Sequence, residues 1–312
     1  MSSSSASTSD PSGDEPGPEL GPDAGSGDGS APAAARSGRP GRLVLVGTPI
    51  GNLGDLTPRA IEALASADLV CCEDTRRTGR LLQHAGIRAR ELKVVNDHTE
   101  DRAVAEVVGR VTRGEVVAVV TDAGMPGISD PGERLVAEVA AAGEVIEVVP
   151  GPSAAITALV ASGLPAGRFA FEGFLPRKGS GRSERLRSVA VERRTVVLYE
   201  APHRLARTLA DLVEACGPDR RVVLARELTK LHEELWRGSL ADAVAHAAAV
   251  DPRGEYVLVL DGAPKPAEVT DADIVDALAR VRAAGASTRD AVAEVAADLG
   301  VPKRRVYDLA TS

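Results

Sequence analysis

Short apolar runs alternate with helix-like segments through the first half of the chain. The apolar runs cover residues 43–46, 67–72, 93–95, 115–122 and 145–149, and the segments with apolar residues at helical spacing cover 59–66, 79–86, 102–113 and 133–142. Uninterrupted aliphatic runs are typical of strands that are buried on both faces. The alternation therefore predicts a parallel α/β sheet with helices on both sides.

The pattern changes from Phe169 onward. Residues 169–174 alternate large side chains with small or charged ones, which predicts a strand with one covered face, as in a mixed sheet. Further strands are predicted over 194–202, 221–230 and 254–262, the last closing the sheet, with helices over 154–162, 203–216 and 241–249. This segment is predicted to be an α+β domain.

The last 45 residues form a third pattern. After a linker at 263–267, three short helices are predicted over 274–283, 288–298 and 303–310, with a turn at Gly300-Val-Pro. A turn followed by a helix that carries basic residues is typical of a helix-turn-helix unit. A helical cap packed on the main domain is the alternative.

Composition sets the remaining boundaries. Residues 1–40 are rich in Ser, Gly, Pro and Ala, so we expect a disordered tail, followed by domains at 41–150 and 151–262 and a helical RNA-binding unit at 270–312. The tail has a net charge of −4 of the chain's −8, so overall acidity says little about partners. No membrane-spanning run or secretory signal is apparent, and Cys71, Cys72 and Cys216 have no metal-site spacing. We expect a cytoplasmic protein without a metal.

Polar or glycine-rich loops follow the predicted strands of the first domain, at residues 47–52, 73–77, 122–132 and 150–153. Ligands bind at the carboxyl ends of strands in open parallel sheets, and glycine allows close backbone approach. Residues 73–77 suit substrate contact and helix capping equally well. Asp122 is placed to bond a ribose or an amino group.

Basic side chains gather after Pro176. Seven basic residues and two acids lie between residues 177 and 194, a local net charge of +5. A Gly-Ser-Gly interruption predicts a flexible basic loop that grips a phosphate backbone, and a solvated charged face is the alternative. The candidate RNA contacts are Arg177, Lys178, Arg182 and Arg185, together with Lys303, Arg304 and Arg305 of the C-terminal unit.

Taken together, the motifs resemble those of the small-subunit ribosomal RNA (cytidine-2′-O)-methyltransferases, a family of the tetrapyrrole methylase superfamily. The matching stretches are 46–57, 73–76, 121–132, 150–153, 199–204 and 226–230. The resemblance covers about residues 42–262 and the C-terminal helical unit. Residues 47–52 lack the Gly-Pro-Gly form that tetrapyrrole-modifying members carry.

The resemblance implies a two-domain α/β tetrapyrrole-methylase fold, with S-adenosylmethionine in a cleft between the domains, and a homodimer. The substrate would be a cytidine of 16S rRNA, free or in the 30S subunit. The residues carried over as cofactor contacts, several through their backbone, are Ile50, Asp122, Ala123, Gly124, Gly127, Ser153, Ala154, Glu200 and Leu228. Loops 47–52, 122–132 and 150–153 would then form one wall of the cofactor site.

The reaction would be an in-line displacement at the sulfonium methyl by a ribose 2′-hydroxyl, which requires alignment and removal of a proton. Catalytic candidates are Lys230, Asp74 and Glu73, with His98 and Glu227 as further possible bases. Lys230 would act as a base if desolvation lowers its pKa, or would otherwise hold a phosphate. Two alternatives are a methyltransferase for a tetrapyrrole or other small molecule and a non-catalytic nucleic-acid-binding regulator.

Overall fold

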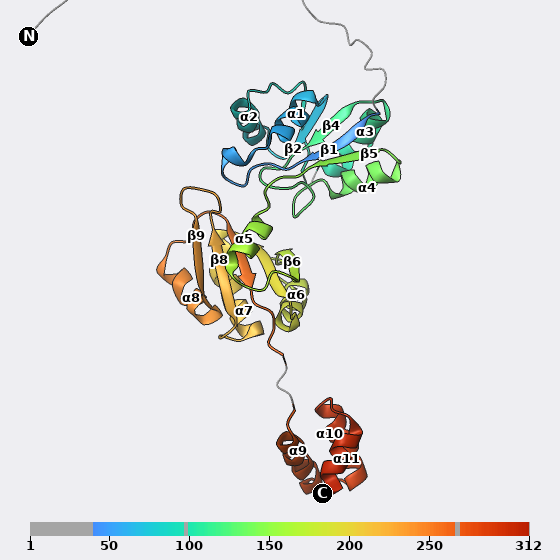
Figure 1. The fold of residues 1–312 in the computed structure, drawn as a ribbon, viewed down its shortest axis with the longest axis vertical. Helices are drawn as coiled ribbons and strands as arrows, with labels where there is room; N and C mark the ends of the chain where they lie inside the picture. The colour runs from blue at the N-terminus through green and yellow to red at the C-terminus, as the bar shows by residue number, and fades with distance from the viewer. Residues whose placement is uncertain (1–39, 97–98, 266–268, 312) are drawn as a thin grey trace, which may run out of the picture. The chain divides into compact units, whose positions relative to one another are not determined.

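The computed structural model describes residues 40–96, 99–265 and 269–311. The predictions for the tail up to residue 39 and for His98 lie outside this part of the chain. Two five-stranded sheets with their helices are followed by three further helices (Figure 1). None of the described helices has the length and apolar character needed to cross a membrane.

The first sheet is parallel, with strand order β3-β2-β4-β1-β5. Its strands are β1 (Arg42–Val46), β2 (Leu69–Cys72), β3 (Leu92–Val94), β4 (Val116–Val119) and β5 (Val145–Val149). The helices between them are α1 (Pro58–Ser66), α2 (Thr75–His84), α3 (Glu100–Thr112) and α4 (Glu133–Ala141), and a short 3-10 helix, η1 (Leu53–Asp55), precedes α1.

Both faces of this sheet are buried, which explains its uninterrupted apolar strands. Leu43 and Leu45 of β1 pack in the core cluster that contains α3 and α4. Val44 and Val46 pack in the cluster that contains α1 and α2. Because neighbouring residues of a strand point to opposite faces, every position of β1 after its first must be apolar. The predicted parallel sheet with two helical layers is confirmed.

Helix α2 begins four residues earlier than the sequence predicted. The carboxylate of Asp74 accepts a hydrogen bond from the backbone N–H of Arg76 at 2.8 Å and so caps the helix. For Asp74, the structure therefore favours the capping interpretation of the charged cluster over substrate contact.

The second sheet is mixed, with strand order β6-β7-β10-β8-β9. Its strands are β6 (Phe169–Phe174), β7 (Thr195–Glu200), β8 (Arg221–Arg226), β9 (Glu234–Ser239) and β10 (Tyr256–Leu260). Its helices are α5 (Ala154–Ser162), α6 (Ser180–Val191), α7 (Pro202–Cys216) and α8 (Leu240–Ala249). Strand β6 is parallel to β7 and the other pairs are antiparallel, so the predicted mixed sheet is confirmed.

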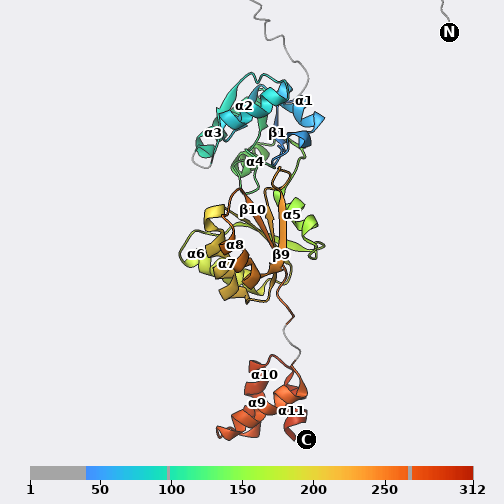
Figure 2. The same cartoon turned by 90° about the vertical axis from the view of Figure 1, so that its left-hand side faces the viewer.

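Two details of this sheet differ from the prediction. Strand β10 lies in the middle of the sheet rather than closing it, which accounts for its five buried residues. Strand β9 was not predicted, because an edge strand is only partly covered and its sequence lacks an apolar run. Helix α5 packs on one face of the sheet and α6, α7 and α8 pack on the other (Figure 2).

The expected flexible basic loop is also corrected. Helix α6 begins at Ser180, so the Gly-Ser-Gly segment is the start of a helix, with Gly179 at a φ of 85° just before it. A positive φ is accessible to glycine at little cost, and it turns the chain into the helix.

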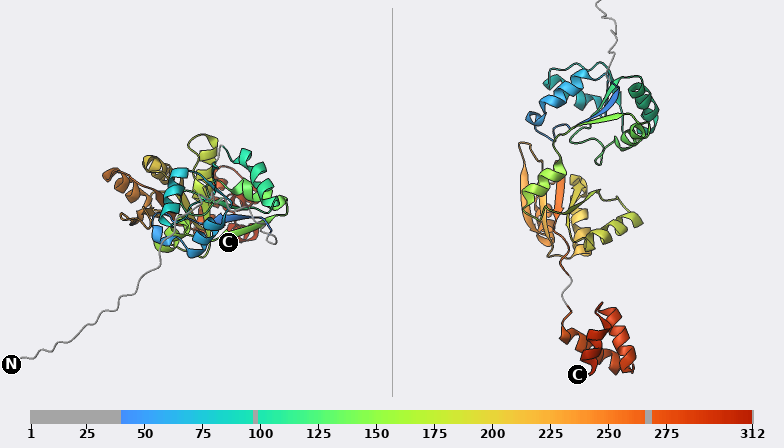
Figure 3. Two further views of the ribbon diagram at one scale, coloured as in Figure 1. Left: turned by 90° about the horizontal axis from the view of Figure 1, so that it is seen from above. Right: turned by 45° about the vertical axis from the view of Figure 1, so that its right-hand side comes forward.

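The last three helices are α9 (Asp271–Ala283), α10 (Thr288–Asp298) and α11 (Lys303–Thr311) (Figure 3). They share a core of their own, in which Ile274, Val295 and Val306 are almost completely buried. Thr270 and Asp273 form a capping box at the start of α9. The three predicted helices are confirmed.

Candidate functional site

Backbone contacts join three loops at the carboxyl ends of the first sheet's strands. A Cβ atom placed on Gly47 would lie 2.5 Å from the nitrogen of Gly151, and one placed on Gly151 would lie 2.8 Å from the Cα of Gly47. Thr48 and Gly124 exchange backbone hydrogen bonds of 2.9 and 3.2 Å. The loops that follow β1, β4 and β5 therefore form one continuous wall.

The loop after β4 has an unusual backbone path. Gly124, Gly127 and Gly132 have φ values of 89°, 80° and 127°, and Ser129 has a φ of 61°. Such conformations favour glycine and are uncommon for serine. The buried carboxylate of Glu100 accepts three backbone N–H groups at the end of this loop, at 3.0–3.2 Å. Sequence reasoning missed Glu100, whose only signal was an acid at the start of a helix.

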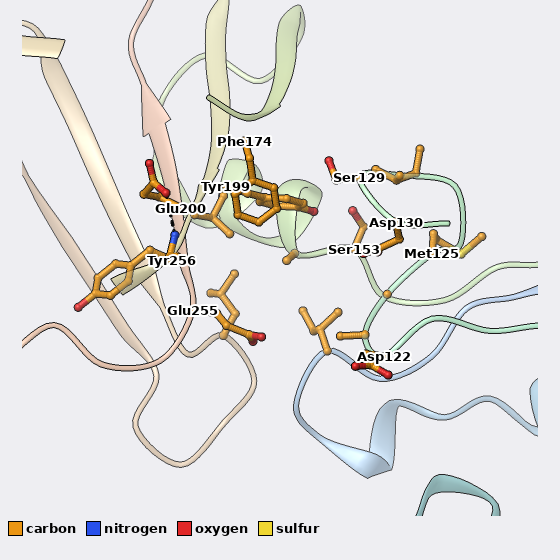
Figure 4. A pocket seen from close by; sticks show the side chains of 18 of the residues that line it. Asp122, Met125, Ser129, Asp130, Ser153, Phe174, Tyr199, Glu200, Glu255 and Tyr256 are labelled. Atoms are coloured by element: carbon orange, nitrogen blue, oxygen red, sulfur yellow. Dashed lines mark hydrogen bonds between the residues drawn. The ribbon is translucent and has the colours of Figure 1, made fainter. Parts of the chain in front are cut away.

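A pocket of about 390 Å³ lies against this wall (Figure 4). Residues 50–154 contribute Ile50, Glu73, Arg77, Asp122, Ala123, Gly124, Met125, Ile128, Ser129, Asp130, Ser153 and Ala154 to its lining, and residues 174–257 contribute Phe174, Tyr199, Glu200, Ala201, Pro202, Leu228, Glu255, Tyr256 and Val257. Eight of the nine residues carried over as cofactor contacts are among them. The ninth, Gly127, turns the loop and donates a hydrogen bond to the carbonyl of Pro131 at 3.1 Å.

Aromatic side chains are among the lining residues that the sequence did not predict. The ring of Tyr199 packs against Phe171 and Phe174 with centroid distances of 5.1 and 5.5 Å. Its hydroxyl accepts a hydrogen bond from the backbone N–H of Ala155 at 3.2 Å, whereas Ser153, at the N-cap position of α5, makes no side-chain capping bond. Burial raises the pKa of Tyr199, so its hydroxyl stays protonated at neutral pH. Tyr199 thus ties the second sheet to α5.

Glu200 is a buried carboxylate that the protein itself satisfies. Oε1 accepts a hydrogen bond from the backbone N–H of Ala201 at 2.9 Å and forms an ion pair with Arg204 Nε at 3.1 Å, and Oε2 accepts a hydrogen bond from the hydroxyl of Thr208 at 2.5 Å. Its side chain therefore shapes the pocket wall.

Arg182 belongs to the same network. Its guanidinium donates to Thr208 at 3.0 Å and to the carbonyl of Pro176 at 2.9 Å, and it pairs with Asp211 at 2.6 Å. Its side chain is 5% exposed. The assignment of Arg182 to an RNA-binding surface was wrong, because this guanidinium anchors α6 to α7 inside the protein.

Asp122 presents a polar atom for a ligand. Its Oδ1 is buried and has no hydrogen-bond partner among the described residues, while Oδ2 lies 3.4 Å from Arg77 Nε. Burial raises the pKa of Asp122, although the nearby Arg77 opposes the shift. A buried oxygen without a hydrogen-bond donor destabilises the folded state, and a bound ligand that donates a hydrogen bond removes this cost.

The three catalytic candidates lie in different surroundings. Glu73 lines the pocket, whereas the carboxylate of Asp74 is bonded to Arg76, which lowers the pKa of Asp74. Lys230 lines an adjoining pocket of about 370 Å³ and pairs with Glu227 at 3.0 Å and Glu255 at 2.7 Å. Burial acts to lower the pKa of Lys230, but the two carboxylates outweigh it and raise the pKa. The lowered pKa that base catalysis by Lys230 requires is therefore not found.

The other RNA candidates are all exposed, and two of them are held in ion pairs. Arg177, Lys178, Lys303 and Arg304 are exposed. Arg185 pairs with Glu172, and Arg305 pairs with Asp271 at 2.7 Å and thereby joins α11 to the start of α9. Within the described residues, no group of three or more His, Cys, Asp or Glu side chains is arranged to hold a metal ion.

Comparison with known proteins adds to this geometry. Residues 42–244 match the family Tetrapyrrole (Corrin/Porphyrin) Methylases, and residues 268–312 match the RsmI C-terminal HTH domain. Proteins named Ribosomal RNA small subunit methyltransferase I are 44% identical in Synechocystis sp. and 47% identical in Mycobacterium bovis. Both matches cover 86% of this chain, and 97% and 94% of the respective relatives. The solved structure of the methyltransferase CobJ aligns with a TM-score of 0.55 and 25% identity, over 72% of this chain and 95% of CobJ.

Proposed function

This chain belongs to the tetrapyrrole (corrin/porphyrin) methylase family and is a methyltransferase, and we propose that it methylates the ribose 2′-oxygen of a cytidine in small-subunit rRNA with S-adenosylmethionine as donor. The observation that carries the proposal is similarity to small-subunit rRNA methyltransferases of 44–47% identity over 86% of the chain. The separate match of the helical unit supports a nucleic-acid substrate. Such a substrate places the protein in the cytoplasm.

The pocket fits a methyl donor of this kind. Its volume of about 390 Å³ is within the usual range of small-molecule sites, about 300–1,000 Å³. Aromatic and aliphatic side chains suit an adenine ring, and the partnerless Oδ1 of Asp122 suits a ribose hydroxyl or an ammonium group. S-adenosylmethionine, when bound, supplies a methyl group that its sulfonium charge already activates.

The chain's own residues have two tasks in this mechanism. The wall made by the loops after β1, β4 and β5 fixes the position of the donor through backbone contacts, since Gly47, Thr48, Gly124 and Gly151 hold one another in place. Glu73, a carboxylate in the pocket lining, is proposed to accept the proton that the 2′-hydroxyl loses. Alignment and proton removal are what this displacement requires.

Lys230 is proposed to bind a phosphate of the RNA rather than to act as a base. Its raised pKa keeps it charged, and it lines the adjoining pocket beside Arg77 and Arg80. Lys230→Ala is expected to lower RNA affinity and to leave single-turnover methyl transfer at saturating RNA unchanged. An equal loss of rate at saturation would instead assign a chemical role to Lys230.

A methyl-transfer assay with labelled S-adenosylmethionine tests the function as a whole. We expect label on small-subunit rRNA, in an alkali-resistant dinucleotide that locates the methyl group on the 2′-oxygen. Label on a porphyrinoid would support the small-molecule alternative. Donor binding without transfer to either substrate would support a regulator.

A homodimer is also proposed. Helix α5 is apolar on most of its surface, yet Ile156 and Val160 are 45% and 69% exposed. Val148, on the edge strand β5, is 47% exposed. Exposed apolar residues of this kind mark association surfaces when they lie together. In light scattering, the wild type is expected to have the mass of a dimer and Val160→Glu that of a monomer. An unchanged mass would show that this surface is not the dimer interface.

A further inference from the structure

We propose that a basic groove at the end of the second sheet opposite the pocket binds phosphate groups of the RNA substrate. This inference rests on the proposed function and adds a contact surface remote from the chemistry. The groove adjoins the start of β7 and the end of β10, whereas the pocket is lined at the end of β7 and the start of β10. Three residues of β7 lie between Thr195 of the groove and Tyr199 of the pocket, so the two sites are about 13 Å apart along the strand.

The groove has a volume of about 1160 Å³. Its lining comprises Pro165, Gly167, Arg168, Ser188, Val191, Glu192, Arg193, Arg194, Thr195, Asp261, Gly262, Ala263 and Lys265. The residues come from the segment before β6, the end of α6, the turn into β7 and the chain that leaves β10. A groove much larger than the donor pocket, with few apolar side chains, suits a polymer backbone better than a small apolar ligand.

The positive charges of the groove are the ones that remain available. Glu192 is bonded to Arg194 at 2.7 Å, and Asp261 is bonded to Arg221 at 2.6 Å. Arg168, Arg193 and Lys265 are exposed, and no ion pair to any of the three is found within the described residues. Cations without a partner on a concave surface attract phosphate groups and release bound counterions when phosphates bind.

A buried arginine holds the groove in shape. Arg220, 7% exposed, donates hydrogen bonds to the carbonyls of Asp261, Val189, Ala190 and Glu192 at 2.7–3.1 Å. It thereby ties the end of α6 to the chain that leaves β10.

The backbone itself adds a second tie. Ala263 donates to the carbonyl of Glu192 at 2.7 Å, and a Cβ on Gly262 would lie 2.0 Å from the carbonyl oxygen of Arg193. The backbone at Arg193 is therefore fixed by contacts with Gly262 and Ala263. Less conformational entropy is lost when its side chain binds a phosphate.

The connection to the helical unit favours RNA as the occupant. Lys265 lines the groove, and the cap of α9 is Thr270, five residues later. Five residues span at most about 18 Å, so the start of that unit stays within reach of the groove. The exposed Lys303 and Arg304 give the same unit cations that suit the phosphates of an RNA strand.

The test compares two double variants of the full chain that remove equal charge. Arg168→Gln/Arg193→Gln alters the groove, and Arg88→Gln/Arg102→Gln removes two exposed arginines for which no ion pair is found among the described residues. Affinity for small-subunit rRNA is measured as a function of salt concentration, alongside kcat and KM for methyl transfer and the melting temperature.

For the groove variant we expect a five- to fifty-fold higher KM, an unchanged kcat and a salt slope reduced by about 1.4–1.8, since each lost phosphate contact removes about 0.7–0.9. The control pair should leave the KM unchanged. Arg168→Lys/Arg193→Lys should keep the wild-type slope, which separates charge from folding. An equal loss of rRNA affinity in both glutamine variants, or no loss in either, would contradict the proposal that the groove binds RNA. Failure of the wild type to methylate rRNA would instead refute the proposed function.

Discussion

At the scale of single residues, backbone proximity determines which glycines are required. Gly47 and Gly151 touch each other through backbone atoms, so a side chain on either would push two loops apart. Gly51 is also crowded, but its nearest neighbours are side-chain atoms of Lys230 and Thr229. A flexible lysine can move aside, whereas two bonded loops cannot.

The pair Gly151→Ala and Gly51→Ala tests this distinction. Gly151→Ala is expected to destabilise the fold by about 1–3 kcal/mol, the usual cost of overpacking, and to weaken donor binding. Gly51→Ala should melt within a degree or two of the wild type. Thermal unfolding followed by circular dichroism measures both, and equal melting temperatures for the two variants would contradict the argument.

The cysteines provide a second test at this scale. Burial raises the pKa of Cys71 to about 12 and also raises that of Cys72, and both side chains are almost completely inaccessible. Cys216 is only half-buried. Because the thiolate is the reactive form, iodoacetamide at pH 8 should label Cys216 first in the folded protein and all three cysteines in urea. Mass spectrometry of the labelled peptides checks the order, and early labelling of Cys71 would contradict it.

At the scale of elements, the basic segment that leads into helix α6 contains both a buried and an exposed cation. Its buried Arg182 links Pro176, Thr208 and Asp211, whereas Lys178, just before the helix, is exposed. Net charge along the sequence cannot separate a buried arginine from an exposed lysine, because burial of Arg182 depends on the contact of α6 with α7.

Arg182→Gln should therefore lower stability, whereas Lys178→Gln should lower RNA affinity. Loss of Arg182 leaves Asp211 without its buried partner and is expected to cost about 3 kcal/mol of the free energy of unfolding. Loss of Lys178 should change stability by less than about 0.5 kcal/mol and should weaken rRNA binding. Chemical denaturation and RNA titration measure the two effects. An Arg182→Gln protein of wild-type stability with weak RNA binding would support the original assignment of Arg182 to an RNA-binding surface.

At the scale of the whole molecule, the proposed mechanism depends on the residues that line the pocket and on surfaces proposed to hold RNA. Every residue in the pocket lining has a number of 50 or higher. The N-terminal 39 residues carry six of the chain's 45 acidic residues and half of its net charge of −8, and they contain no residue that the proposed mechanism uses.

Deletion of residues 1–39 is therefore expected to leave the rate of rRNA methylation and the melting temperature unchanged. The comparison is between the full chain and the truncated chain in the labelled-methyl assay. A large loss of activity would show that the tail takes part in binding or in folding.

The sequence by itself determined the order of the elements apart from β9, the parallel and mixed sheets, the strand-end loops and the family. These follow from local periodicity, from glycine and proline positions and from motifs that are contiguous in the chain. Only the tertiary structure decided that Asp74 caps a helix, that Arg182 is buried and that Tyr199 reaches Ala155. It also assembled the groove of Arg168, Arg193 and Lys265 from three separate segments. Burial and long-range pairing depend on which faces meet, and that information is absent from any single stretch of sequence.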